Sequence, residues 1–342
     1  MTERTGPTGA PAVRRIALTF PGQGAQHPRM AAGLYGVSRT FTATMDLAFD
    51  TLPGGRSLRT AWLADRPPAD YDDVARAQPL LYAVDCALGA MITEAGVRPD
   101  ALLGHSVGEL AAATLAGVLA FHDGLRYLSE YVEVYRHAPP GGMLAVAAGP
   151  GEVAAHLEPG VVIGALNAPR QLLLSAEETA LTRAETALRR AGITCARVRA
   201  RQPFHHPVMR DVAAAHADIL TRPPLKPPHT TVHSACTGQE LDDDTATDWA
   251  FWLAQPAEPV LYGPALHHLL NSGPHLLIEA GPGQSLTALA RRTPQVARGD
   301  SAAVALLPAR AGTPDADVAA VRAALNRIVA LHGVFPAPVP DF

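Results

Sequence analysis

The stretch ALLGHSVGELAAATLA, residues 101–116, carries the strongest structural signal in the chain. Its opening apolar residues predict a short buried strand that stops at Gly104, and the run of Ala and Leu after Glu109 predicts a helix. The GxSxG sequence between them fits a sharp turn that pushes a serine out at the end of a strand. Ser106 is therefore the candidate nucleophile; the alternative is a Gly-Ser-Gly turn that arose by chance.

Two other buried runs end in turns in the same way. Arg14–Phe20 stops at Pro21-Gly22, and Leu276–Glu279 stops at Gly281-Pro282-Gly283. We expect both to be strands of one large α/β domain that also contains the GxSxG turn.

The region between residues 142 and 200 has a pattern of its own. It predicts the order βαββαβ, with strands at 143–147, 161–166, 171–175 and 194–199 and helices at 152–157 and 179–191. The predicted fold class is α/β: a large α/β-hydrolase-like domain with a parallel sheet, and an inserted small ferredoxin-like (βαββαβ) subdomain. The predicted boundaries are 12–142 and 207–308 for the large domain, 143–206 for the small subdomain, and 309–342 for a C-terminal helix and tail.

Composition excludes several classes of function. With 48% hydrophobic and 18% charged residues and a net charge of −4, the chain is an ordinary globular protein without the basic field that nucleic acids require. Residues 1–11 lack the apolar core of a secretory signal, and no apolar run approaches the roughly 20 residues that span a bilayer, so we expect a cytoplasmic protein that binds no membrane. The 3 cysteines form no CxxC pair and the 14 histidines show no metal-ligand spacing, so we expect no metal site and no bound cofactor.

A serine nucleophile needs a base, and a histidine is the usual one. His105 adjoins Ser106 in the turn, so its side chain should point elsewhere. His205, in PFHHP at residues 203–207, follows the last strand of the small subdomain, where a loop could reach back to the serine. Spacing alone leaves it one candidate among several.

Seven short signatures together resemble one family. They are Phe20–Gln26 (FPGQGAQ), Gln78-Pro79, Gly104–Glu109 (GHSVGE), Ala116–Leu119 (AGVL), Asn167–Gln171 (NAPRQ), Phe204-His205 and Glu279–Gly283 (EAGPG). In order and spacing they resemble the malonyl-CoA:carrier-protein transacylases and the acyltransferase domains of polyketide synthases, over about residues 16–295.

The resemblance implies a catalytic dyad of Ser106 and His205 with no acidic third member. It also implies an oxyanion hole formed by the backbone N–H groups of Gln23 and Val107. The acyl carrier would be the phosphopantetheine arm of an acyl carrier protein, or CoA.

The resemblance further implies a substrate cleft between the two parts of the fold, with Gln78 and Asn167 in its lining. The Phe204-His205 pair looks like the Phe-His of malonyl-type rather than methylmalonyl-type domains, so Phe204 joins the predicted substrate-binding residues.

One position departs from the family pattern. Members that use dicarboxylic acyl groups carry an arginine on the helix after the nucleophile, and an ungapped alignment puts Tyr131 there. Arg126 and Arg136 would project roughly 140° away around the helix, and Glu130 and Glu133 would make the neighbourhood acidic.

Burial of a carboxylate without its partner is costly, so we expect a monocarboxylic, aminoacyl or peptidyl cargo. The alternative is that an unseen insertion shifts the helix or that another arginine enters the pocket.

The predicted protein is a trans-acting acyltransferase of polyketide assembly whose partner is an acyl carrier protein. Because such carriers are usually acidic, Arg291, Arg292 and Arg298 are candidates for a docking rim, against the simpler reading that they are solvated surface residues. Three other functions stay open: malonyl transfer, hydrolysis of acyl groups from carrier proteins, and a scaffold role without catalysis.

Overall fold

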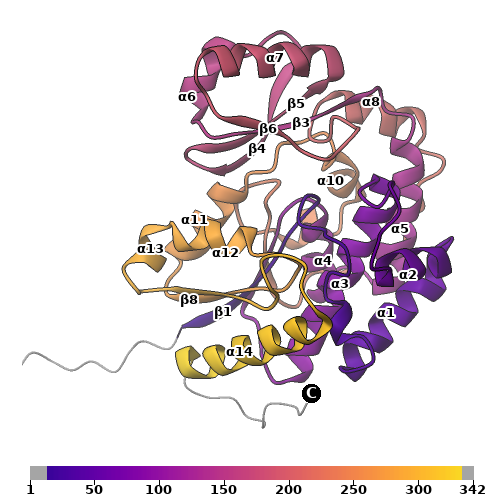
Figure 1. Ribbon diagram of the computed structural model, residues 1–342, viewed down its shortest axis with the longest axis vertical. Coiled ribbons are helices and arrows are strands. Elements are labelled where there is room, and N and C mark those ends of the chain that lie inside the picture. Colours follow the sequence, from indigo (N-terminus) through magenta and orange to yellow (C-terminus); the bar gives the residue numbers. More distant parts are fainter. Residues whose placement is uncertain (1–13, 333–342) are drawn as a thin grey trace, which may run out of the picture.

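The computed structural model describes residues 14–332, and its centre is a parallel sheet of five strands in the order β7-β2-β1-β8-β9 (Figure 1). The predicted N-terminal segment 1–11 and the tail 335–342 lie outside the described residues. Five of the six residues of β1 and all of β8 are buried, which explains why both read as unbroken apolar runs. The strands are β1 (Arg15–Phe20), β2 (Ala101–Gly104), β7 (Thr231–His233), β8 (His275–Glu279) and β9 (Ala302–Ala305).

Helices cover both faces of this sheet (Figure 1). The longest, α3, has apolar residues on nearly every side and is buried along most of its length, which places it in the core rather than on the surface. None of the described helices is long and apolar enough to cross a membrane. The helices of this part are α1 (Arg39–Thr51), α2 (Gly55–Leu63), α3 (Val74–Glu94), α4 (Val107–Leu115), α5 (Phe121–Tyr135), α8 (Val208–Ala215), α9 (Asp243–Ala246), α10 (Trp249–Ala254), α11 (Tyr262–Asn271), α12 (Ser285–Arg291), α13 (Pro294–Ala297) and α14 (Pro314–His332), with the 3-10 turn η1 (Ala32–Leu34).

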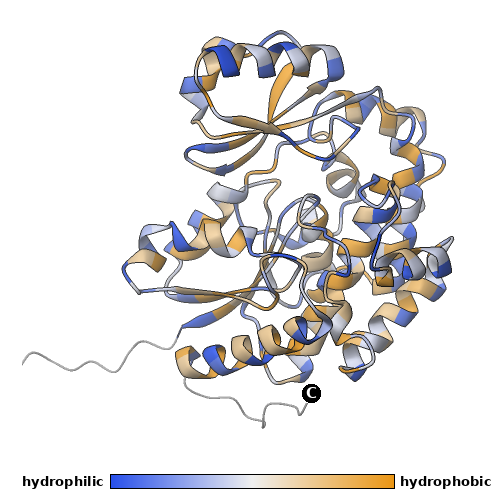
Figure 2. Cartoon of the chain, in the orientation of Figure 1, coloured by the Kyte–Doolittle hydropathy of each residue, from blue (hydrophilic) through white to orange (hydrophobic). Residues whose placement is uncertain are grey.

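A separate antiparallel sheet, in the order β4-β5-β3-β6, forms the small subdomain. Its core is its own, built from apolar residues of the sheet and of the inner face of α7, including Leu144, Leu174 and Leu181. In Figure 2, α7 is mostly blue and white over the orange β5, as expected for a helix with one buried face. The elements are β3 (Gly141–Val146), α6 (Pro150–Val153), η2 (Ala154–His156), β4 (Val161–Ala168), β5 (Gln171–Glu177), α7 (Glu178–Arg190) and β6 (Cys195–Arg197).

Backbone hydrogen bonds join the small subdomain to the large one. Val260 donates to Gly164 at 2.9 Å, and Leu166 donates to Val260 at 2.8 Å, so one strand of the small sheet is fixed to the segment that precedes α11. This junction lies beside the loop between β6 and α8, which carries His205. The position of that histidine is therefore set by both parts of the fold.

Candidate active site

Ser106 occupies the turn between β2 and α4 in a conformation that side chains rarely adopt, with φ 55° and ψ −120°. The glycines around it leave no room for a side chain. A Cβ on Gly104 would lie 2.1 Å from the backbone nitrogen of Glu109, and one on Gly108 would lie 2.2 Å from the carbonyl oxygen of Phe20. The GxSxG pattern is thus a packing requirement of a strained turn that presents the serine.

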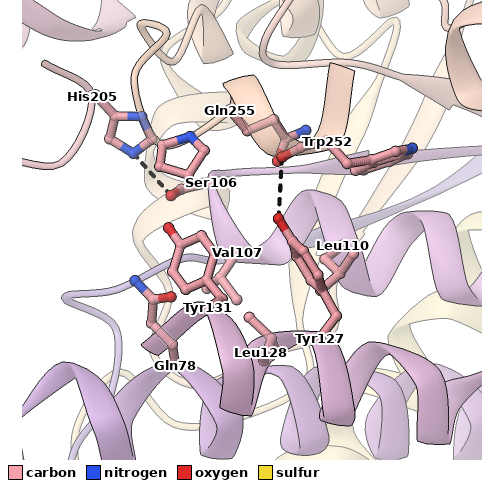
Figure 3. Close-up of a pocket in the computed structure, with 11 residues that line it drawn as sticks. Gln78, Ser106, Val107, Leu110, Tyr127, Leu128, Tyr131, His205, Trp252 and Gln255 are labelled. Carbon is pink, nitrogen blue, oxygen red and sulfur yellow. Dashed lines mark hydrogen bonds between the residues drawn. The ribbon is translucent and has the colours of Figure 1, made fainter. Parts of the chain in front are cut away.

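His205 reaches Ser106 from the loop between β6 and α8 (Figure 3). Its Nε2 lies 2.9 Å from the Ser106 Oγ, and its Nδ1 lies 2.8 Å from the carbonyl oxygen of Glu258. Because a carbonyl only accepts, Nδ1 carries the proton and Nε2 is left to accept one from the serine. A backbone carbonyl thus orients the imidazole where a carboxylate does so in a catalytic triad.

Burial controls the charge of this histidine. Removal from water lowers the pKa of His205 to about 4, against a smaller raising effect of its bond to Glu258, and the nearby His105 lowers it further. The imidazole is therefore neutral at physiological pH and is available as a base.

The His105 side chain points away from Ser106 and makes contacts of its own, as its place in the turn predicts. Its Nε2 donates to the Oδ1 of Asn167 at 2.8 Å, and its ring packs against that of Tyr262. The bond joins the nucleophile turn to β4 of the small subdomain, so Asn167 supports the turn and also lines the cleft described below.

The loop that carries Gln23 lies directly against the Ser106 turn. A Cβ on Gly22 would lie 2.4 Å from the carbonyl oxygen of His105, and the Gln23 side chain accepts from Gln78 Nε2 at 3.1 Å. Within residues 14–332, no protein acceptor takes a hydrogen bond from the backbone N–H of Gln23 or Val107. Both donors predicted for the oxyanion hole are thus free to bind a substrate oxygen.

A small cavity of about 30 Å³ lies beside Ser106 and is lined mainly by aromatic and apolar side chains (Figure 3). Over the described residues, no Arg, Lys, Asp or Glu belongs to that lining. Tyr131 points into the cavity between Gln78 and the serine. The lining residues are Gln78, Ser106, Val107, Leu110, Tyr127, Leu128, Tyr131, His205, Trp252, Gln255 and Pro256.

Aromatic rings hold Tyr131 in place. Phe204 lies parallel to it, with ring centroids 6.2 Å apart, and Tyr135 meets it edge-on at 4.5 Å. Phe204, predicted to bind substrate, stacks on Tyr131 and is not among the described residues that line the cavity. Its contribution to the cavity is indirect.

The acidic neighbourhood expected from Glu130 and Glu133 is absent from the described lining of the cavity, and that expectation was wrong. The carboxylate of Glu130 accepts from Arg126 and from the backbone and hydroxyl of Thr221, while Glu133 pairs with Arg136. Glu130 and Glu133 lie one and two residues from Tyr131, so they point about 100° and 200° away from it around α5 and line a different hollow.

A second, larger hollow of about 440 Å³ opens on the other side of the Ser106 turn, between the two parts of the fold. Gln23, His105 and Asn167 line it, together with charged side chains at its rim. Arg199 of the small subdomain pairs with Asp72 of the large domain at 2.9 Å, and Asp72 also accepts from Gln26 at 3.1 Å. Charged side chains line this inter-subdomain cleft, whereas the described lining of the cavity has none.

The three arginines expected at a docking rim do not gather there. Arg298 pairs with Asp300, and Arg292 contacts Gln171 at 3.4 Å, at the margin of the cleft. Arg291 is exposed at the end of α12. None of the three is among the described residues that line the inter-subdomain cleft.

Sequence reasoning missed one side of the cavity. Trp252 belongs to α10, and Gln255 directly follows that helix. The Tyr127 hydroxyl donates to the Trp252 carbonyl at 3.3 Å. Within the described chain, Gln255 Nε2 is buried without a hydrogen-bond partner. Only the apolar pair Phe251-Trp252 could have hinted at a buried segment here.

Comparison with known proteins identifies relatives along nearly the whole chain. Residues 18–330 match the family model described as acyl transferase domain. A phenolphthiocerol/phthiocerol polyketide synthase polypeptide of Mycobacterium tuberculosis (strain CDC 1551 / Oshkosh) is 35% identical over 291 residues, which is 84% of this chain and 19% of that protein. The chain thus spans about a fifth of that relative's length.

Solved structures agree with this match. The acyltransferase domain of SpnD, in complex with 2-(pent-4-yn-1-yl)malonyl, is 30% identical with a TM-score of 0.84, over 96% of this chain and 79% of that one. A loading acyltransferase from the avermectin modular polyketide synthase is 26% identical with a TM-score of 0.79, over 90% of this chain and 99% of that one.

Proposed function

The chain belongs to the acyl transferase domain family, and from this membership and the geometry of its site we propose that it moves an acyl group from a thioester onto the phosphopantetheine thiol of an acyl carrier protein in polyketide biosynthesis. The observation that carries the proposal is the 2.9 Å contact between Ser106 Oγ and His205 Nε2 at the end of a parallel strand. The donor is an acyl-CoA or an acylated carrier protein.

The first half-reaction acylates the serine. The Ser106 hydroxyl passes its proton to His205 Nε2 while Oγ attacks the thioester carbonyl carbon, and the backbone N–H groups of Gln23 and Val107 stabilise the oxyanion. The carbon–sulfur bond then breaks, and the departing thiolate takes the proton from Nε2. The Glu258 carbonyl stabilises the imidazolium through Nδ1–H in between.

The second half-reaction repeats these steps with a new nucleophile. The thiol of the carrier's phosphopantetheine loses its proton to His205 Nε2, its sulfur attacks the acyl-Ser106 carbonyl, and the serine oxygen departs with that proton. Ping-pong kinetics follow, because the first product leaves before the acceptor reacts. In this proposal the inter-subdomain cleft receives the pantetheine arm.

We further propose that the acyl group has no free carboxylate, and that it is monocarboxylic, aminoacyl or peptidyl. The cavity wall supports this: over the described residues it offers the Tyr131 hydroxyl and two amides but no cation. A carboxylate entering there would lose its hydration without a guanidinium to replace it.

Malonyl transfer is the second candidate function. The SpnD acyltransferase domain, which is 30% identical to this chain, was solved in complex with a substituted malonyl group. Transfer of malonyl by this chain would require a cation from outside the present cavity lining.

Hydrolysis of the acyl-enzyme uses the same dyad with water as the acceptor, so one assay must count both products. The purified chain is mixed with an acyl thioester and a separately produced carrier protein, and acyl-carrier and free acid are measured together. The proposal predicts mainly acyl-carrier, formed in trans, with a mass adduct on Ser106. Free acid as the main product would identify a hydrolase, and no adduct with any thioester would leave a scaffold role.

A further inference from the structure

Three metal-ligating side chains meet at the edge of the large sheet, away from the residues that line the cavity and the cleft. They are His233 at the end of β7, Glu240 after the following turn, and His268 on α11. One ligand atom from each lies within 4.8 Å of the other two. The backbone itself brings two of them together, because His233 and Glu240 form an antiparallel bridge.

His233 is the fixed member of the group. Only 2% of its surface is exposed, and its Nδ1 has no hydrogen-bond partner among the described residues. Its Nε2 lies 3.8 Å from Glu240 Oε1, and its ring centroid lies 5.5 Å from that of His268. At 3.8 Å the Nε2 that faces Glu240 is beyond hydrogen-bonding distance, so this nitrogen is available to coordinate an ion.

We propose that His233, Glu240 and His268 bind one divalent transition-metal ion of the zinc type. Two imidazoles and one carboxylate are the donor set of known three-ligand zinc sites, in which water completes the tetrahedron. Zinc–nitrogen bonds of about 2.0–2.1 Å require neighbouring ligands roughly 3.3 Å apart. Glu240 and His268 are exposed and can rotate by the ångström or so that closure needs, while His233 stays in place.

The electrostatic surroundings are compatible with such an ion. Arg15 adds positive charge near His233, and its partner Ser272 is neutral. Glu240 supplies the negative charge that an ion beside these groups needs.

The consequence of binding would be structural. The ion would tie α11 to the turn between His233 and Glu240, and the same turn is held from inside by Glu109 Oε2, which accepts from the backbone of Ala235 at 3.1 Å. Glu109 belongs to α4, the helix that follows Ser106. A metal here would therefore stiffen the support of the nucleophile helix without entering the reaction.

Tag-free, chelator-treated protein is titrated with Zn²⁺ by calorimetry and with Co²⁺ by visible absorption, which reports tetrahedral nitrogen and oxygen ligands. We expect one equivalent bound and a higher melting temperature with Zn²⁺. His268→Ala and Glu240→Gln should each weaken binding at least about tenfold, while His267→Ala, a neighbour on the same helix that contacts Asn271 instead, should leave it unchanged.

Both ligand variants change exposed residues, and circular dichroism of the metal-free proteins checks that they fold. The proposal is overturned if the wild type binds neither ion stoichiometrically, or if the two ligand variants bind as the wild type does. These readouts do not depend on acyl transfer, so their failure leaves the proposed function standing.

Discussion

Two hollows lie beside the turn that carries His105 and Ser106, and they differ in both size and chemistry. The cavity has a volume of about 30 Å³ and a largely aromatic lining, and since His205 is neutral, no side chain of its described lining is charged. The inter-subdomain cleft has a volume of about 440 Å³ and is rimmed by Arg197, Arg199 and Asp72. A thioester has two unlike ends, an acyl group and a polar pantetheine arm. Under the proposed function, the cavity would select the acyl end by excluding charge, and the larger cleft would receive the arm.

Loss of the dyad should have the largest effect, because the dyad serves both half-reactions. Ser106→Ala should abolish transfer and the acyl-enzyme adduct, and His205→Ala should lower kcat by ~10²–10⁴-fold or more. His206→Ala is the matched control, since its ring contacts the carbonyl of Gly160 rather than the serine. Single-turnover rates would reject the assignment if the control were crippled and His205→Ala were active.

Tyr131→Arg should make the cavity favour acyl groups that carry a free carboxylate. A guanidinium in place of the phenol supplies charge-assisted hydrogen bonds worth ~1.5–3 kcal/mol, which corresponds to roughly a 10- to 100-fold shift in the malonyl-to-acetyl ratio of kcat/KM. Tyr131→Phe keeps the ring stacked on Phe204 and should leave that ratio near its wild-type value. An unchanged ratio in the folded arginine variant would mean that charge in the cavity does not set selectivity.

The pH profile of kcat/KM should show how far water is excluded from His205. Because burial lowers the pKa of His205 to about 4, the acid limb of kcat/KM should lie near that pH, so activity at pH 5.5 should be about tenfold higher than an ordinary histidine would allow. Between about pH 6.5 and 4, His205 is protonated in the unfolded chain but not in the folded protein. The free energy of unfolding should therefore fall as the pH falls through this range. If the acid limb of the acylation rate lay near pH 6.5 instead, that would show that solvent reaches the imidazole.

The smallest effect should come from the rim of the cleft. Arg199→Ala removes an ion pair whose arginine side chain is 84% exposed, so kcat/KM for the carrier protein should fall by less than about fivefold. Arg183→Ala, which breaks a comparable exposed pair with Glu158 away from the cleft, should have no effect. A loss of 100-fold or more at Arg199 would make the rim a principal determinant of recognition.

Local geometry explains why the residue pattern alone indicated the serine, whereas its partners were predicted only through the family resemblance. Gly104 and Gly108 are required by contacts within a few residues of the turn or with the adjacent strand, so their pattern is visible in the sequence. His205 meets Ser106 across 99 residues, and only the family resemblance singled it out. The carbonyl of Glu258 leaves no signal in the sequence, because every residue has one.

Side-chain direction limited the prediction around Tyr131. Its position on the cavity wall followed from the alignment, but the stacking of Phe204 behind it depends on tertiary packing. The absence of metal-ligand spacing was likewise uninformative for His233, Glu240 and His268, because His268 meets the other two from α11, further along the chain.

The central claim is that the cavity beside Ser106 admits acyl groups without a free carboxylate, and a competition experiment tests it most directly. Wild-type protein is offered equal, subsaturating amounts of malonyl-, acetyl- and aminoacyl-thioesters, and the acyl-Ser106 adducts are counted by intact mass, with Ser106→Ala as the blank. The account predicts adducts mainly from the two thioesters that lack the carboxylate. A predominant malonyl adduct would contradict it and place the protein with the malonyl transferases.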